Sequence, residues 1–222
     1  MQEAVDDFLN AVVHDIRGPL SQVRAFTALL ERQHKGTLNP DGQELCGLIE
    51  SASRRAVEVV ESIHSYVQVL ETPVFEPADL NALVDAAGFT LQGALERNAA
   101  VITRDDLPCV RGDRAKLLLL FQELLGNALR FRGEAPPRIH CSTVGRDRDG
   151  LVLLSVADNG PGIPATKSEA VFEPLKRLHG TEREGTGMGL TICRRIVEMH
   201  GGNIWVETQS PGGADFRFTL RA

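Results

Sequence analysis

The first third of the chain carries the hydrophobic spacing of two long helices. Over residues 5–70, apolar side chains recur at alternating steps of three and four, the period of a helix that buries one face. The first series consists of Val5, Phe8, Val12, Ile16, Pro19, Val23, Phe26 and Leu30. The second series consists of Leu45, Ile49, Ala52, Ala56, Val59, Ile63, Tyr66 and Leu70. The pattern therefore predicts two successive amphipathic helices.

A polar break over residues 34–41 separates the two series. Within it, Asn39 can cap a new helix through its side chain, and Pro40 suits the first helical position. The two helices are therefore expected to form an antiparallel hairpin. Because two helices alone enclose no interior, we expect the hairpin to bury its apolar seam against a second copy, as a four-helix bundle in a homodimer.

The pattern changes after two prolines in residues 72–77, which indicate a linker because the residue before each proline is displaced from helical geometry. We expect a helical domain over 1–72, a linker over 73–78 and a second domain over 79–222. The predicted elements of the second domain are helices over 79–97, 113–132 and 187–200, and strands over 100–103, 138–144, 151–158, 203–208 and 215–220. The second domain is therefore α+β, with one sheet covered by helices.

Composition narrows the function classes. The 222 residues carry a net charge of −6 with acids and bases interspersed, which argues against nucleic acid as the main ligand. The longest apolar run, residues 117–121, is far below the roughly 20 residues of a membrane span, so we expect no span and a cytoplasmic location. The four cysteines lie far apart, which favours neither a zinc site nor a disulfide framework.

Two glycine-rich motifs together indicate a nucleotide site. They are Asp158-Asn159-Gly160-Pro161-Gly162 and Gly185-Thr186-Gly187-Met188-Gly189-Leu190. A carboxylate beside glycines can accept a hydrogen bond from a base edge while the backbone approaches closely. Glycines at the start of an apolar helix can hold phosphates, because the first N–H groups of a helix are unpaired and its dipole favours negative charge. We therefore predict an ATP-binding protein.

Five motifs in order resemble the sensor histidine kinases of two-component signalling. They are residues 14–20 (His-Asp-Ile-Arg-Gly-Pro-Leu), residues 123–131, the Asp158 motif, residues 171–174 (Val-Phe-Glu-Pro) and the Gly185 motif. The resemblance covers nearly the whole chain, and residues 131–139 and 201–207 look most similar to the kinase cores of bacterial phytochromes. It implies a dimerisation and phosphoacceptor hairpin, followed by an α+β sandwich of the Bergerat ATP-binding type.

The resemblance also implies roles for single residues. His14 matches the phosphoacceptor, and Asp15 matches an adjacent acid that can hold the other ring nitrogen. Asn127 matches a Mg²⁺ ligand, a role that suits a hard amide oxygen. Glu123 stands where many histidine kinases carry Asn and the ATPase relatives carry a water-orienting Glu. This departure leaves open either futile ATP hydrolysis or a role of Glu123 in the phosphotransfer.

The implied ATP contacts lie in the second domain. Asp158 matches the residue that accepts a hydrogen bond from the adenine amino group. The full set is Asn127, Arg130, Phe131, Asp158, Gly160, Gly162, Arg177, Gly185, Thr186, Gly187, Gly189 and Leu190. Arg130 shares the helical face of Asn127 and can contact a phosphate, and a solvent-facing side chain remains the alternative. Gly18 stands where many relatives carry a Thr or Asn that places water for dephosphorylating their partner, so we expect weak or absent phosphatase activity.

The expected function is ATP- and Mg²⁺-dependent autophosphorylation of His14, followed by transfer to an Asp of a response-regulator receiver. An upstream sensor domain or sensor partner would regulate it. Two alternatives remain: a non-catalytic dimeric phosphorelay module, or an ATPase or serine kinase of the same nucleotide fold. The first alternative would relay phosphate without using ATP, and for the second His14 would be incidental.

Overall fold

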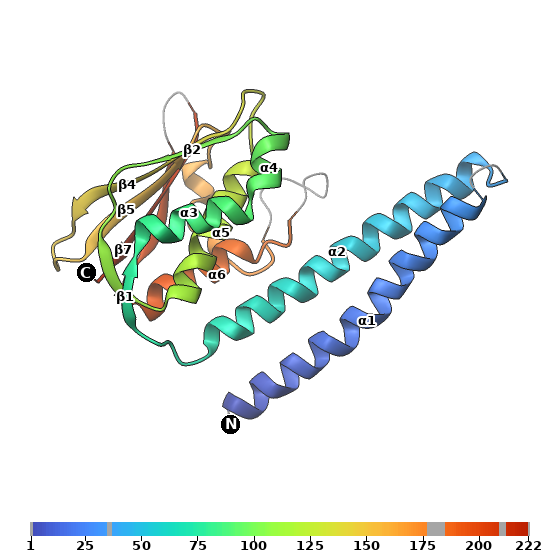
Figure 1. The fold of residues 1–222 in the computed structure, drawn as a ribbon, viewed down its shortest axis with the longest axis horizontal. Coiled ribbons are helices and arrows are strands. Elements are labelled where there is room, and N and C mark those ends of the chain that lie inside the picture. Colours follow the sequence, from blue (N-terminus) through green and yellow to red (C-terminus); the bar gives the residue numbers. More distant parts are fainter. Residues whose placement is uncertain (1, 35–36, 177–184, 209–211, 222) are drawn as a thin grey trace. The chain divides into compact units, whose positions relative to one another are not determined.

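The structure, a computed structural model, describes residues 2–34, 37–176, 185–208 and 212–221, although no side chain is described for residues 2–10, 12 and 14. It divides into two compact units, residues 1–70 and most of residues 71–222 (Figure 1). Across the described residues, no helix combines the length and hydrophobicity that crossing a membrane requires.

The first unit is an antiparallel helical hairpin of α1 (Gln2–His34) and α2 (Pro40–Leu70), as predicted (Figure 1). Asn39 caps α2, because its Oδ1 accepts a hydrogen bond from the Gly42 backbone N–H at 2.8 Å. Pro19 lies inside α1, and the helix continues through it to His34. The proline leaves the carbonyl of Asp15 without its usual helical donor.

The hairpin buries one set of apolar residues and leaves another exposed. Val13, Cys46, Val57, Val60 and Val67 are buried. A second set, here called the exposed apolar face, consists of Ile16, Val23, Phe26, Leu29, Leu30, Leu45, Leu48 and Ile49. Phe26 is the extreme case, with 67% of its surface exposed in the single chain. Much of the predicted seam is therefore uncovered in one copy of the hairpin.

The second unit contains a five-stranded mixed sheet. In spatial order it consists of β2 (Val101–Arg104), β4 (Arg138–Arg146), β5 (Val152–Asp158), β7 (Ala214–Leu220) and β6 (Ile204–Thr208). β2 and β4 are parallel, and the other neighbours are antiparallel. The predicted pairing of 138–144 with 151–158 and the closing hairpin are both confirmed.

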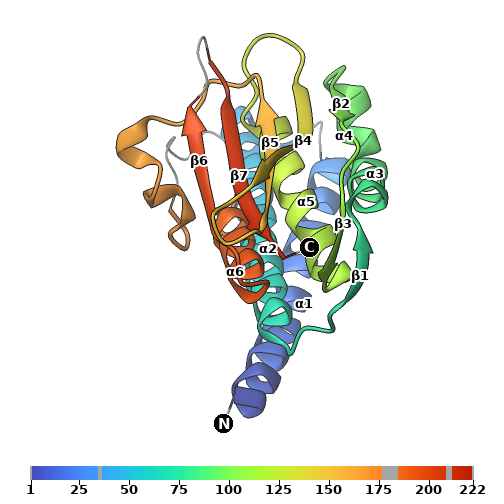
Figure 2. The ribbon, with the colours of Figure 1, turned by 90° about the vertical axis from the view of Figure 1, so that its left-hand side faces the viewer.

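Helices cover one face of this sheet (Figure 2). They are α3 (Leu80–Thr90), α4 (Gln92–Arg97), α5 (Arg114–Arg130) and α6 (Gly189–Met199), with two 3₁₀ turns, η1 (Ala165–Lys167) and η2 (Ala170–Phe172). The core lies between the layers, where Phe121 of α5 meets Phe218 of β7 edge-to-face at 6.1 Å. The predicted α+β class is therefore confirmed.

Two predictions need correction. The helix expected over residues 79–97 is divided at Leu91 into α3 and α4. Residues 76–78, expected in the linker, belong to β1 (Glu76–Asp79), which pairs antiparallel with β3 (Cys109–Gly112). Each of these strands has only four residues, too few to show an alternating pattern, and β3 was not predicted at all.

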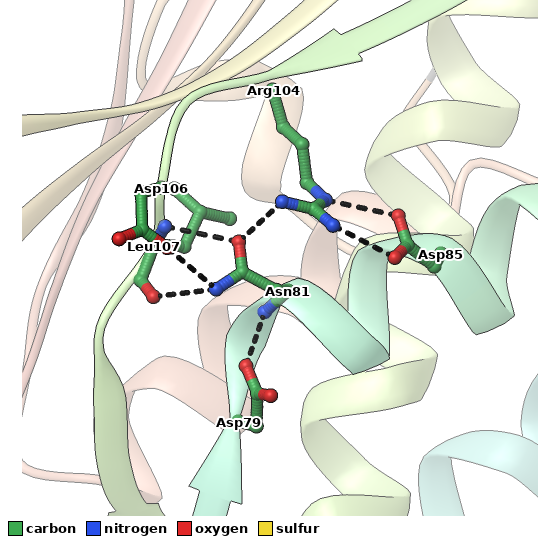
Figure 3. Close-up of polar contacts among 6 residues, drawn as sticks. All are labelled: Asp79, Asn81, Asp85, Arg104, Asp106 and Leu107. Atoms are coloured by element: carbon green, nitrogen blue, oxygen red, sulfur yellow. Dashed lines mark hydrogen bonds and ion pairs between the residues drawn. The ribbon is translucent and has the colours of Figure 1, made fainter.

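A polar network fastens the edge of the sheet to α3 (Figure 3). The guanidinium of Arg104 donates two hydrogen bonds to the Asp85 carboxylate, each 2.9 Å long, and this contact lowers the pKa of Asp85. Arg104 also donates to Asn81 Oδ1, which accepts from the Leu107 N–H as well. The network fixes the loop between β2 and β3 onto the start of α3.

Candidate functional site

Three polar side chains of α5 lie on one helical face at i, i+4 and i+7, namely Glu123, Asn127 and Arg130. Asn127 is buried, with 7% of its surface exposed, and its Oδ1 accepts a hydrogen bond from Arg130 Nη1 at 3.3 Å. Burial raises the pKa of the Glu123 carboxyl, and the charge of Arg130 opposes that rise. Asp113 caps the start of α5, because its Oδ1 accepts a hydrogen bond from the Lys116 N–H. The face therefore combines an acid, an amide and a cation.

Asp158 ends β5 with its carboxyl held by the backbone. Its Oδ1 accepts hydrogen bonds from the N–H groups of Gly160, at 2.7 Å, and Ala214, at 3.2 Å. Burial raises the pKa of Asp158, whereas the two backbone hydrogen bonds lower it. In the described part of the chain, no group donates to Oδ2. One oxygen thus orients the carboxyl, and the other can accept a hydrogen bond from a ligand.

Gly213 supports this arrangement and was not among the predicted site residues. Its φ is +110°, a conformation that side chains rarely adopt, and an added Cβ would overlap the backbone oxygen of Asp158. Only a glycine therefore lets the start of β7 approach the end of β5. The run Gly212-Gly213 before a strand was the available signal, but its partner lies 55 residues away in sequence.

Asn159 also supports the Asp158 motif, although it was not among the predicted site residues. Its Oδ1 accepts a hydrogen bond from the Arg138 N–H at 2.8 Å, and its Nδ2 donates to the Pro136 carbonyl at 3.0 Å. These bonds attach the chain before β4 to the Asp158 motif. Gly160 lies against the end of α5, because a Cβ there would lie 2.9 Å from the Phe131 carbonyl oxygen. The Asp158 motif therefore contacts α5 directly.

The start of α6 faces Glu123 and Asn127. A Cβ added to Gly189 would overlap Glu123 Oε2 and would lie 4.0 Å from Asn127 Nδ2. Met188, which precedes α6, provides no side-chain capping hydrogen bond. The first N–H groups of α6 can therefore donate to an anion beside the polar face of α5.

The remaining predicted residues fall in several places. His14 and Asp15 lie in α1, where Asp15 is exposed and the His14 side chain is outside the described residues. Phe131 follows α5 and is half-buried, Gly162 follows the Asp158 turn, and Leu190 lies in the first turn of α6. Gly185, Thr186 and Gly187 precede α6. Arg177 lies outside the described residues. The structure thus brings together Glu123, Asn127, Arg130 and Gly189, and joins Asp158 to Phe131 through Gly160.

Two family profiles match the two units. Residues 4–70 match the profile described as "His Kinase A (phospho-acceptor) domain". Residues 112–222 match the profile described as "Histidine kinase-, DNA gyrase B-, and HSP90-like ATPase". The chain belongs to the sensor histidine kinases.

Known histidine kinases and phytochromes are similar to this kinase core over most of its length. Cyanobacterial phytochrome A of Nostoc sp. is 36% identical over 216 residues, which cover 96% of this chain and 28% of that protein. The adaptive-response sensory kinase SasA of Prochlorococcus marinus is 32% identical over 228 residues, which cover 98% of this chain and 57% of that kinase. The predicted likeness to phytochrome kinase cores is confirmed, and the chain spans only part of these relatives.

A solved structure supports the fold of the second unit. The catalytic domain of the histidine kinase ThkA superimposes with a TM-score of 0.57 and 28% identity, covering 67% of this chain and 95% of that chain.

The donor chemistry of the kinase core suits a hard cation bound together with phosphates. Among the described residues, no group of three or more His, Cys, Asp and Glu side chains could hold a metal by itself. The side-chain oxygens of Asn127, which is buried, and of Glu123, which is half-buried, are of the kind that Mg²⁺ prefers, and phosphate oxygens and waters would complete its shell. These residues therefore fit a magnesium ion that arrives with a nucleotide.

Proposed function

We propose that the chain is a protein-histidine kinase that transfers the γ-phosphoryl group of ATP to His14 and relays it to an Asp of a response-regulator receiver. The observation that carries the proposal is the Asp158 carboxyl, whose Oδ1 is held by two backbone N–H groups, while no donor among the described residues reaches Oδ2. Oδ2 can accept a hydrogen bond from the adenine amino group, whereas guanine carries an oxygen at that position and cannot donate.

The phosphate end of the nucleotide is proposed to lie at the start of α6. The first N–H groups of a helix favour anions, and Arg130 adds a positive charge on the neighbouring face of α5. Asn127 would hold the magnesium ion, which supplies neutralisation of phosphate charge when bound. The proposed lining of the nucleotide site is completed by Phe131, Gly160, Gly162, Arg177, Gly185, Thr186, Gly187 and Leu190.

The transfer itself requires a neutral imidazole nitrogen of His14. That nitrogen forms a bond to the γ-phosphorus while the bond to the bridging oxygen of ADP breaks, so that ADP leaves with the electron pair. Asp15 would hold the other ring nitrogen and increase the basicity of the nucleophile. Glu123, half-buried beside Gly189, would orient either the reacting groups or a water molecule, and the second role would appear as ATP hydrolysis without phosphorylation.

The proposed domains are a dimerisation and phosphoacceptor domain over 1–72 and a catalytic ATP-binding domain that includes all of β1 and so covers 76–222. Homodimerisation is supported by the exposed apolar face of the hairpin, which a second copy would cover. The proposed partners are a response-regulator receiver and an upstream sensor domain or sensor partner.

The test is autophosphorylation with γ-labelled ATP followed by acid treatment. Phosphohistidine is a phosphoramidate that acid hydrolyses, whereas phosphoserine survives acid. We expect acid-labile label that His14→Gln abolishes and Asp158→Asn reduces, with both variants remaining folded. Acid-stable label, or label unchanged by His14→Gln, would show that a different kinase chemistry operates. ATP turnover without label would identify an ATPase, and lack of nucleotide binding would favour the phosphorelay module.

A further inference from the structure

A short irregular segment, residues 165–176, packs against α6. It contains the 3₁₀ turns η1 and η2 and ends beside the glycines that precede α6. Phe172, at the end of η2, is buried with 2% of its surface exposed, and its ring meets Phe216 of β7 edge-to-face at 6.5 Å. Phe172 therefore anchors the segment to the sheet.

Arg194 of α6 binds this segment at two points. Its guanidinium carbon lies 4.5 Å from the centroid of the Phe172 ring, a cation–π contact. Its Nη2 donates to Glu169 Oε2 at 2.9 Å. Glu169 directly precedes η2 and Phe172 is its last residue, so one side chain fixes both ends of this turn. A planar guanidinium can stack and pair at the same time, whereas an ammonium group concentrates its charge at one point.

Thr191 holds the same segment from the same face of α6. Its Oγ1 donates to the Phe172 carbonyl at 3.0 Å, and Thr191 lies three residues before Arg194. Beyond Phe172, the backbone of Leu175 contacts Gly187, since a Cβ there would lie 2.8 Å from the Leu175 carbonyl carbon. Leu175 has a φ of +59°, a strained value that these surroundings must maintain.

The first turns of α6 therefore lie between two groups of residues. Gly189 faces Glu123 and Asn127 on α5, whereas Thr191 and Arg194 hold residues 169–172. We propose that Arg194 is a positioning residue of the nucleotide site, which sets the distance between the Phe172 segment and the start of α6. The inference depends on the proposed function, because it assumes that ATP phosphates bind at that start.

The chain offers a matched control in the next residue. Arg195 has the same charge and lies in the same helix, but within the described residues its Nη1 makes a 3.9 Å ion pair with Glu198 and its buried Nε has no hydrogen-bond partner. Arg194→Met keeps the apolar stem and removes the stacking charge and the ion pair, and Arg195→Met makes the same chemical change one position away. Arg194→Lys retains the charge and can satisfy one of the two contacts at a time.

The experiment measures Mg²⁺-dependent binding of a non-hydrolysable ATP analogue by calorimetry, and the initial autophosphorylation rate as a function of ATP. For Arg194→Met we expect an increase of up to about tenfold in Kd and in the KM for ATP, a limit reached if the whole free energy of one cation–π contact and one exposed ion pair supports the nucleotide-bound state. We expect kcat to stay within about twofold, because the reacting groups are unchanged. Arg194→Lys should lie between wild type and Arg194→Met.

Hydrogen exchange supplies the structural measurement. Backbone amides in residues 165–176 should exchange faster in Arg194→Met than in Arg195→Met, while those of α5 remain protected. Equal KM values for the two Met variants, or a loss of thermal stability without a change in KM, would overturn the inference. Failure of the wild-type protein to bind the analogue would instead refute the proposed function.

Discussion

Replacing Gly213 with alanine should damage the nucleotide site more than the rest of the fold. The residue has a φ of +110°, and the new Cβ would overlap the Asp158 carbonyl oxygen. The atom that the new Cβ meets is backbone of β5, and Gly213 directly precedes β7, so no flexible side chain can move aside. The start of β7 must therefore separate from the end of β5.

The expected loss in the free energy of unfolding has two contributions. An alanine held at positive φ costs about 1–3 kcal/mol. Separation also stretches the hydrogen bond from the Ala214 N–H to Asp158 Oδ1, and a hydrogen bond to a charged group contributes about 1.5–3 kcal/mol. We therefore expect Gly213→Ala to lower the free energy of unfolding by about 3 kcal/mol or more. Because Asp158 loses half of its support, ATP affinity should fall at least about tenfold.

Gly201→Ala separates the steric effect from the strain. Gly201 has a φ of +74°, but a Cβ there would meet nothing within 4 Å. This variant should lose only about 1 kcal/mol and bind ATP normally. Urea unfolding and calorimetric titration with a non-hydrolysable ATP analogue measure the two quantities. If both variants lose the same stability and neither loses ATP affinity, the proposed support of Asp158 by Gly213 is wrong.

Three further outcomes are expected. Phe26→Glu should make the protein monomeric by light scattering, whereas Ala28→Glu, on the opposite side of α1, should leave it dimeric. Gly18→Thr should change the free energy of unfolding by no more than about 1 kcal/mol, because an added Cβ meets no atom within 4 Å. The variant should dephosphorylate a cognate phospho-receiver faster, and an unchanged rate would contradict the role given to Gly18. Burial lowers the pKa of His200, so on acidification the imidazole is protonated at a higher pH in the unfolded chain than in the folded one. The free energy of unfolding should therefore decrease as the pH drops below about 6.5. Urea midpoints at pH 7.5 and 5.5 should differ less in His200→Gln.

The physical basis of the last prediction is the bonding of His200. Its ring accepts a hydrogen bond from the Asp113 N–H at Nε2, at 3.0 Å, and its Nδ1 donates to the Ile196 carbonyl at 2.7 Å. Protonation of Nε2 would remove the acceptor. Asp113 favours the protonated ring and Lys116 opposes it, and Phe75 packs edge-to-face on the ring at 5.2 Å. A pH-independent urea midpoint in wild type would show that the imidazole is not held in this neutral form.

Local sequence determined the features that depend on neighbours along the chain. The helical period predicted α1 and α2, and Asn39 and Asp113 mark helix starts because an N-cap bonds within three residues of itself. The motif around Asp158 could be recognised because its glycines and carboxylate are adjacent. These interactions need no knowledge of the fold.

Tertiary structure alone decided the contacts that join distant segments. β1 and β3 pair although each has only four residues, because the helices of the second unit bring them together and bury Ala78 and Val110. Gly213 reaches Asp158, and Arg194 reaches Phe172, across intervals that no local pattern connects. A single sequence records which side chains are available, whereas the packing of sheet and helices selects the partner that each of them meets.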